Sequence, residues 1–269
     1  MAEKETKNKP KDIIEAVPEE FEKLAKEIEI SGEELEELPE EVKEVFVEEE
    51  KKKDFRANIS GWNPRTKLGK IVKEGKIKNI DELLTDDTKI LEPEIVDSLL
   101  SLESDLLLIG QAKGKFGGGK RRAWRQTQKK TQEGNVVSFS AMAVVGDRKG
   151  HVGIGYGKAK ETLPAREKAI RLAKLNIIKV NRGFETPEKD SEPHTVPLKV
   201  EGKCGSIRIK FLPAPRGTGL VAADECKKIL RLAGIEDVYS VTRGKTRTTF
   251  NLAKACINAL EKTNGVRIE

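Results

Sequence analysis

The segment that most constrains the fold is a predicted β-strand in which every second residue is glycine. Successive side chains of a strand point to opposite faces, so residues 151–158 place apolar side chains on one face and Gly153, Gly155 and Gly157 on the other. Glycine weakens a strand unless another backbone packs closely against it. We expect a crossing helix to cover this face, and an RNA backbone is the alternative that the residues leave open.

The segments on either side of the glycine strand predict a hairpin covered by a helix. In residues 137–145, the apolar side chains at odd positions alternate with Ser138, Ser140 and Met142, which indicates a strand. Residues 146–150 have the composition of a tight turn. A helix is expected from Thr162, with cations on one face. Its apolar face is expected to hold Ala165, Ala169, Leu172, Ala173 and Leu175. The fold class is therefore α+β.

The C-terminal part predicts a second, smaller sheet with helices. Strands are expected at residues 195–200, 207–211 and 237–242, and a helix from about Leu220 to Gly234. A helix between two strands indicates a βαβ unit. The last helix is expected to bury Phe250, Ala253, Ile257 and Leu260.

Charge divides the chain very unevenly. Residues 1–50 hold 7 Lys against 19 Asp or Glu, whereas the rest holds 44 basic and 26 acidic residues. An acidic leader joined to a basic body indicates a polyanionic partner for the body. We expect the leader to be partly disordered, with a partner-docking helix or an electrostatic shield against wrong RNA contacts as alternatives. A turn at residues 62–69 and a helix opened by Pro93 then predict a helical extension.

These observations divide the chain into five parts. They are an acidic leader (1–54), a helical extension (55–102), a hairpin-and-helix domain (103–180), a linker (181–193) and a C-terminal βαβ domain (194–269).

The stretch before the hairpin carries the strongest functional signal. Residues 105–109 are an apolar run that fits a buried strand, and no acid occurs from Leu106 to Gln132. Three consecutive glycines (117–119) and the aromatic residues Phe116 and Trp124 lie in this stretch, so its backbone can approach a phosphate and its rings can stack on bases. We predict an RNA-binding arm, with a solvated hairpin tip as the alternative. Its cations are Lys113, Lys115, Lys120, Arg121, Arg122, Arg125, Lys129 and Lys130.

Two further loops combine cations with glycine. Residues 213–219 place Arg216 between prolines and glycines, and residues 243–247 place cations before a helix start, where backbone N–H groups can bind a phosphate. The alternative for each loop is a structural turn whose charges are solvated and bind no phosphate. The predicted RNA-binding set is completed by Lys158, Lys160, Arg216, Arg243, Lys245 and Arg247.

Several functional classes lack the residues they need. Residues 114–121 nearly spell a phosphate-binding loop, but Arg121 replaces the Ser or Thr that would bind magnesium. His151 and His194 stand alone in sequence, with no local carboxylate–histidine pair, so we expect no catalytic residues, metal or cofactor. The three cysteines are dispersed, which suits reduced thiols in the cytosol. No apolar run is long enough for a membrane span, and we expect no secretion signal.

Several segments of the sequence resemble the ribosomal protein S5 family of the small subunit, in its archaeal and eukaryotic form. They occur in family order from about Gly61 to Leu260, and the most specific cover residues 138–147, 150–161, 173–178, 194–197, 202–206 and 213–219.

The resemblance implies a fold and a function. It implies a first domain similar to the double-stranded-RNA-binding fold and a second domain of left-handed βαβ type. It also implies a non-enzymatic, cytoplasmic constituent of the small ribosomal subunit that binds rRNA through the first-domain hairpin. Family members lie near the messenger entrance and the decoding region, so neighbouring proteins of that region, and messenger RNA itself, are the expected partners.

Three segments depart from the family pattern, and two other functions stay open. The leader before residue 55 has no family counterpart, residues 113–130 are longer and more basic than is usual, and residues 182–192 lack the family pattern. The first alternative function is an RNA-dependent ATPase or RNA-modifying enzyme that uses the glycine-rich loop. The second is a free regulator that binds double-stranded RNA.

Overall fold

The computed structural model describes residues 62–77, 79–85, 88–111, 121–184 and 193–265. The chain divides into two compact units, Met1–Trp62 and Asn63–Glu269, and everything below concerns the second. The predicted acidic leader lies outside the described residues. So do three of the predicted RNA-binding residues, Lys113, Lys115 and Lys120.

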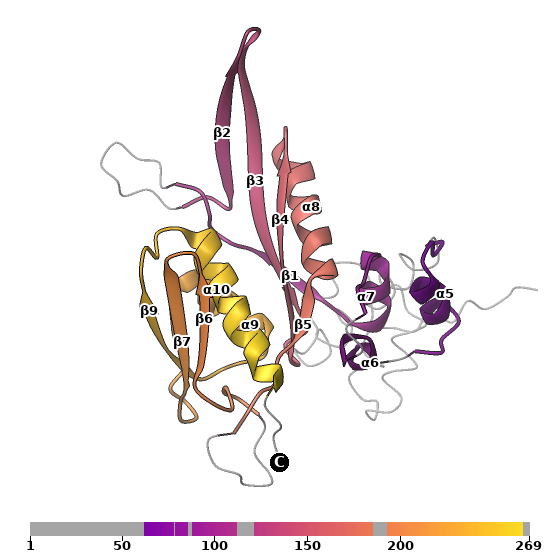
Figure 1. Cartoon of the computed structure of the whole chain (residues 1–269), viewed down its shortest axis with the longest axis vertical. Coiled ribbons are helices and arrows are strands. Elements are labelled where there is room, and N and C mark those ends of the chain that lie inside the picture. Colours follow the sequence, from indigo (N-terminus) through magenta and orange to yellow (C-terminus); the bar gives the residue numbers. More distant parts are fainter. Residues whose placement is uncertain (1–61, 78, 86–87, 112–120, 185–192, 266–269) are drawn as a thin grey trace, which may run out of the picture. The chain divides into compact units, whose positions relative to one another are not determined.

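The first sheet is antiparallel and is built around one long strand (Figure 1). The central strand β3 (Gly134–Gly146) pairs along one edge with both β1 and β2, and along the other edge with β4, which in turn pairs with β5. Because β3 is 13 residues long, one half of its edge can pair with β2 and the other half with β1. The remaining strands are β1 (Glu103–Leu106), β2 (Trp124–Thr131), β4 (His151–Ala159) and β5 (Ile177–Lys179).

The last part of the predicted arm is a regular strand, which was not predicted. Every residue of β2 pairs with β3, from Trp124 opposite Ala141 to Thr131 opposite Gly134. The charges do not prevent this, because the backbone hydrogen bonds need no core and almost all side chains of β2 stay in water. The buried strand predicted at residues 105–109 was also placed wrongly. The strand ends at Leu106, and Leu107 and Ile109 enter the core beyond it.

The glycine face of β4 is covered by helix α8 (Thr162–Leu175), which confirms the expected crossing helix. A Cβ on Gly155 would lie 2.1 Å from the carbonyl oxygen of Ala169, and one on Gly157 would lie 2.1 Å from that of Ala165. The helix therefore rests directly on the strand backbone. Leu172 was expected on the apolar face but is 41% exposed, because alanines at a spacing of four residues already fill the contact.

The second sheet has the strand order β6-β7-β9-β8. Strand β8 (Leu220–Val221) pairs parallel with β9 (Val238–Arg243), and helix α9 (Asp224–Leu232) connects them into a βαβ unit. Its first strand is β8, which was not predicted, because the strand expected at residues 207–211 pairs antiparallel with β9. Strand β7 (Ile207–Pro213) alternates buried and more exposed residues as expected. The remaining elements are β6 (Val200–Cys204), α10 (Thr249–Glu261) and a short 3-10 helix, η1 (Lys262–Gly265).

Some boundaries in this half were predicted wrongly. The first strand begins at Val200 instead of 195, since the preceding residues form only an isolated bridge between Thr195 and Gly183. The helix predicted from Leu220 begins at Asp224, because Leu220 and Val221 form the short strand β8. The glycine end of that helix is confirmed, since Gly234 has a φ of +78°, a conformation that glycine adopts readily.

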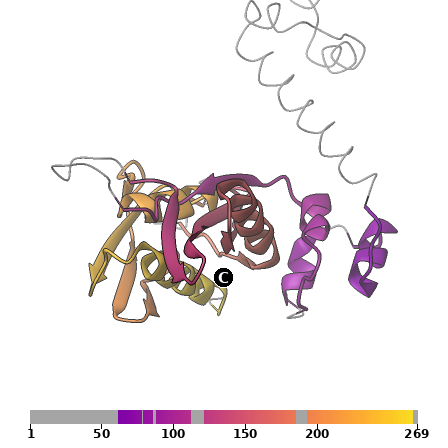
Figure 2. The ribbon, with the colours of Figure 1, turned by 90° about the horizontal axis from the view of Figure 1, so that it is seen from above.

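Buried side chains define the layers of the second unit (Figures 1 and 2). In β3, Ala141 and Ala143 pack with α8, whereas Met142 and Val144 point to the opposite face and join the main core. That core also holds side chains of α9, α10 and the second sheet. The order of layers is therefore α8, the first sheet, the helices α9 and α10, and the second sheet.

In the described residues before the first sheet there are three short helices. They are α5 (Lys67–Lys73), α6 (Ile80–Thr85) and α7 (Pro93–Leu99), and the proline opens α7 as predicted. A hydrogen bond of 2.7 Å from Lys174 Nζ to Asp97 Oδ2 connects α7 to α8. None of the helices in the described ranges is long and apolar enough to cross a membrane.

Candidate nucleic-acid interface

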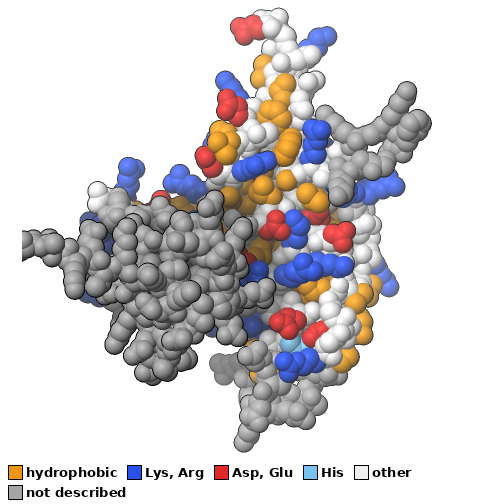
Figure 3. Space-filling view, turned by 180° about the vertical axis from the view of Figure 1, so that it is seen from behind, with side chains coloured by type: hydrophobic (Ala, Val, Ile, Leu, Met, Phe, Trp, Pro, Cys, Tyr) orange, Lys and Arg blue, Asp and Glu red, His pale blue; other side chains and the backbone are white. Residues whose placement is uncertain are grey.

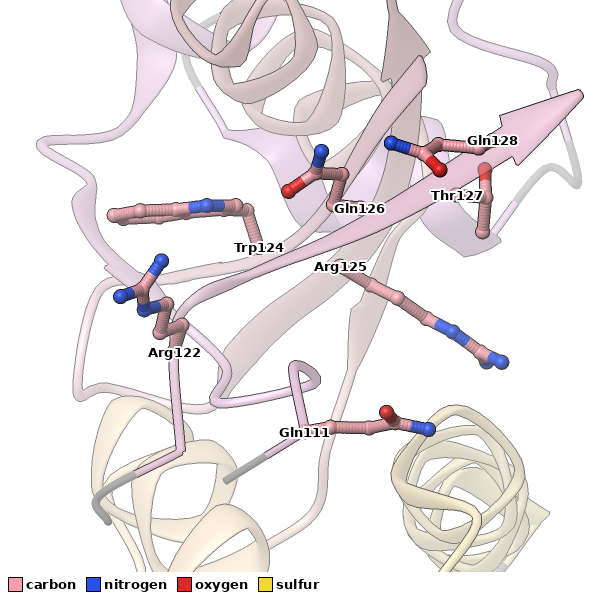
Figure 4. Close-up of a pocket in the computed structure, with 7 residues that line it drawn as sticks. All are labelled: Gln111, Arg122, Trp124, Arg125, Gln126, Thr127 and Gln128. Carbon is pink, nitrogen blue, oxygen red and sulfur yellow. The ribbon is translucent and has the colours of Figure 1, made fainter. Parts of the chain in front are cut away.

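The first part of the candidate interface is a groove along the base of β2 (Figure 4). Its volume is about 370 Å³. Side chains of both faces of the strand contribute, and Arg122 lies beside the ring of Trp124 while Arg125 extends from the opposite side of the strand (Figure 4). The lining residues are Gln111, Arg122, Trp124, Arg125, Gln126, Thr127 and Gln128, and none of them is acidic.

Two guanidinium groups lie over the ring of Trp124. The Cζ atom of Arg122 is 5.8 Å from the ring centroid, and that of Arg166, from α8, is 5.2 Å away. Both distances fit cation–π attraction, which holds the arginines in place without neutralising them. Arg166 was not in the predicted set, because only the pairing of β2, β3 and β4 and the packing of α8 bring it to Trp124.

The second part is a pocket where two distant cationic segments meet. Arg121 and Arg125 line it from the start of β2, and Lys245 and Arg247 line it from the turn before α10. The pocket has a volume of about 470 Å³. All four cations are exposed, and none forms an ion pair within the described ranges. The structure thus joins the predicted arm and the predicted basic turn in one surface.

This pocket also contains the start of helix α10. Thr248 and Thr249 line it, and the side chain of Thr248 makes no capping hydrogen bond. Among the first N–H groups of α10, that of Thr249 donates to the Arg247 carbonyl oxygen and that of Asn251 to the Thr248 carbonyl oxygen. The helix start therefore favours an anion mainly through the partial positive charge of its end. Four cations and a helix start at one cavity make it suitable for backbone phosphates.

Other predicted residues extend this surface along the hairpin. Ser140 of β3 pairs with Arg125 on one side and with Lys158 on the other, so Arg125 and Lys158 share a face about 10 Å apart. Lys129 and Lys130 are exposed near the turn at Gly134. Lys160 is exposed just beyond β4.

Two predicted residues lie elsewhere. Arg216 lines a separate cavity of about 690 Å³ together with Arg148, Arg182 and Arg231. Arg243 is exposed at the end of β9, opposite Arg208 of β7. The back of the molecule mixes Lys and Arg with Asp and Glu, so positive charge does not form one continuous field there (Figure 3).

His151 has the carboxylate partners that the sequence analysis did not find. Its Nδ1 lies 2.6 Å from Asp147 Oδ2, and its Nε2 lies 3.1 Å from Asp81 Oδ1 in α6. Lys179 Nζ lies 3.0 Å from the same Asp81 oxygen. The Asp147 contact is local and could have been predicted from the turn, whereas Asp81 is 70 residues away and could not. The cluster attaches α6 to the hairpin and faces no pocket of the candidate interface.

The charges of this cluster make its stability depend on pH. Burial lowers the pKa of His151, but the hydrogen bonds and charges of Asp147 and Asp81 outweigh it and raise the pKa above the ordinary value of about 6.5. The same pairing outweighs burial in Asp147 and Asp81 and lowers the pKa of both carboxyl groups. Stabilisation by protonated His151 is therefore complete below about pH 6.5 and is lost as pH rises through the raised pKa.

We expect His151→Gln to destabilise the chain more at pH 6 than at pH 8.5. At pH 6 the variant lacks the protonated His151 that pairs with the two carboxylates. At pH 8.5 the wild-type histidine has itself lost most of this charge, so the variant loses less. Urea unfolding at both pH values measures the difference, with Lys149→Gln on the same turn as the control for loss of an exposed polar side chain. A destabilisation that is equal at the two pH values would contradict the assigned ion pair.

The remaining candidates for chemistry offer little. His194 is 6% exposed, and neither ring nitrogen has a hydrogen-bond partner in the described part of the chain. The three cysteines are free thiols, and the hydrogen bond that the neutral Cys256 thiol makes to Cys226, together with burial, raises the pKa of Cys256 well above its ordinary range, so this thiol stays neutral. Within the described ranges, no three His, Cys, Asp or Glu side chains are placed to hold a metal ion.

Comparison with known proteins gives a consistent result. Residues 123–181 match the family model "Ribosomal protein S5, N-terminal domain", and residues 202–268 match "Ribosomal protein S5, C-terminal domain". The small ribosomal subunit protein uS5 of Nanoarchaeum equitans is 51% identical over 214 residues, which cover 79% of this chain and 92% of that protein. The uS5 proteins of Hyperthermus butylicus (48%; 75% and 89% covered) and Methanocaldococcus jannaschii (47%; 79% and 92% covered) are similarly close.

Proposed function

The chain belongs to the ribosomal protein S5 family, and on that premise we propose that it holds rRNA in the small ribosomal subunit through the cationic surface of β2 and the α10 start. Family membership makes it a structural, non-enzymatic constituent of the small subunit, so the ATPase and RNA-modifying alternatives are set aside. The observation that carries the proposed surface is the meeting of Arg121 and Arg125 with Lys245 and Arg247 at one pocket.

The proposed mechanism is electrostatic and geometric. Each phosphate that a Lys or Arg neutralises releases counterions, and guanidinium groups can bind a phosphate with two hydrogen bonds. Trp124 and its two arginines add a planar, cationic surface against which an unpaired base can stack. The outer residues Lys129, Lys130, Lys158 and Lys160 extend the contact along the hairpin, and Lys113, Lys115, Lys120 and Arg122 belong to the same proposed set.

The finer fold assignment is part of the proposal. The order β2, β3, β4, α8, with the helix on one face of an antiparallel sheet, supports a double-stranded-RNA-binding-like domain over residues 103–180. The β8–α9–β9 unit supports a left-handed βαβ domain over residues 194–269. Residues 55–102 are proposed as a helical extension, 181–193 as a linker and 1–54 as an acidic leader.

The proposed position is the messenger entrance of the subunit. Ribosome association and partnership with rRNA and small-subunit proteins follow from the family. We propose in addition that the neighbours are the proteins of the entrance region, that messenger RNA passes close by, that the chain supports decoding accuracy, and that it works in the cytoplasm.

Sedimentation tests the placement directly. We expect the tagged chain to migrate with the small subunit and to stay there after a wash at about 1 M salt. Salt weakens each phosphate contact, but a chain held by many contacts within an assembled subunit dissociates slowly. The comparison is migration at low salt. Release to the top of the gradient would indicate that the chain associates only loosely with the subunit through its charge. Binding to generic RNA duplexes as tightly as to rRNA would favour a free regulator of double-stranded RNA.

A further inference from the structure

The second sheet has one covered face and one open face. A Cβ on Gly202 of β6 would lie 2.0 Å from the carbonyl oxygen of Ala255, so α10 rests directly on the strand backbone. Of the side chains of β7 and β9 that point to this side, Ile209, Phe211 and Val238 are buried. Ser240 is half-buried, and Thr242 near the end of β9 is exposed. The alternate residues point to the other side of the sheet, which we call the outer face.

One end of the outer face is apolar. Tyr239 lies directly opposite Leu212 on β7 and opposite Val221 on β8, and Val241 lies one pair further along β9. Val221 is 49%, Tyr239 40% and Val241 43% exposed. The register therefore places the half-buried Leu212 beside the exposed Val221, Tyr239 and Val241 in one patch across three adjacent strands, with Lys210 directly opposite Val241 at its border. Single exposed apolar residues, by contrast, are ordinary on a protein surface.

The other end of the outer face is cationic. Arg208 on β7 lies directly opposite Lys203 on β6 and Arg243 on β9, which makes a row of three like charges across three strands. Within the described ranges none of the three forms an ion pair, whereas the nearby Lys210 is paired with Glu201. Like charges at directly opposite positions destabilise a sheet. The row is therefore costly to the free protein and suits an anionic partner.

We propose that the outer face binds a protein neighbour in the small subunit, one that presents an apolar patch beside Asp or Glu side chains. This inference rests on the proposed function for its setting, but it concerns a different surface. RNA phosphates could neutralise the cation row, and Tyr239 could stack on a base. The aliphatic side chains around it, Leu212, Val221 and Val241, cannot stack and would face a highly charged backbone. A protein surface of mixed apolar and acidic character satisfies both ends, since apolar centres with charged rims are typical of protein interfaces.

Site-specific cross-linking in assembled subunits tests the proposal. A photo-reactive amino acid at Tyr239 is expected to give an adduct that resists ribonuclease and whose cross-linked peptide comes from a ribosomal protein and carries acidic and apolar residues. The same amino acid at Gln126, on the proposed RNA surface, is expected to give an adduct that ribonuclease removes. If only the RNA adduct at position 126 is missing, the result counts against the proposed function. If only the protein adduct at position 239 is missing, it counts against the protein docking surface.

Three results at position 239 would overturn the inference. They are an adduct to RNA, an adduct to residues 1–54 of this chain itself, and no adduct in subunits where position 126 does react. As a second variant, Val221→Asp/Val241→Asp places two negative charges on the apolar end, where they are costly to bury and repel the acidic partner. We expect it to reduce the Tyr239 adduct at least about tenfold. The matched control is Leu198→Asp, an exposed apolar residue outside the patch, which should leave that adduct unchanged.

Discussion

Replacing Gly155 by alanine is expected to lower the free energy of unfolding by about 3 kcal/mol or more, and so to abolish stable folding of the hairpin domain. The added Cβ would lie 2.1 Å from the carbonyl oxygen of Ala169 and 2.2 Å from the backbone nitrogen of Ala173. Both atoms belong to the backbone of α8, so no side-chain rotation relieves the contact and the whole helix must move. Urea unfolding followed by circular dichroism measures the effect.

The control for this substitution comes from the same strand. Lys158 is exposed on β4, three residues beyond Gly155, and its replacement by alanine should change stability by no more than about 0.5 kcal/mol. Wild-type stability of the Gly155→Ala variant would show that α8 does not rest on the strand as described. It would also remove the physical reason for the glycine repeat.

The glycine strand shows what the sequence can reveal about this fold. Three glycines on one strand face require a close neighbour, and the alanines at a spacing of four residues in the next segment can supply it, so the strand and its covering helix were predictable. Strand β2 was not, because its sequence is dominated by charge and it has no buried face. Its stability comes from pairing with β3, which pattern alone does not reveal. The short strands β5 and β8 were missed for a similar reason, since two or three residues carry no periodicity.

The candidate interface was predictable in its residues but not in its geometry. Lack of acids and abundance of glycine and arginine singled out the segments around Arg121 and Lys245 independently. Their meeting at one pocket depends on the packing of α10 against the sheets, which no local pattern indicates. The same holds for Arg166 over Trp124 and for Asp81 beside His151. In each case the partner comes from another element, so only the tertiary fold defines it.

The largest effect on RNA binding is expected from neutralising the pocket where the two segments meet. We expect Arg121→Ala/Arg125→Ala/Lys245→Ala/Arg247→Ala to weaken binding to small-subunit rRNA about 100-fold at low salt, since each lost phosphate contact removes a charge-assisted hydrogen bond. The dependence of log affinity on log salt should become shallower by about 3, because each contact contributes roughly 0.7 to 0.9 to the slope. Filter binding over a series of salt concentrations measures both quantities.

A charge-matched control separates this pocket from general attraction. Lys67, Lys70, Lys199 and Lys262 are exposed and lie outside the pocket, so replacing all four by alanine lowers the net charge equally. If the pocket binds phosphates, this control keeps most of its affinity and slope at about 0.1 M salt, where charges beyond a Debye length of about 10 Å are largely screened. Equal losses in the two variants would mean that RNA responds only to the overall charge. The meeting of the two cationic segments would then have no specific role in binding.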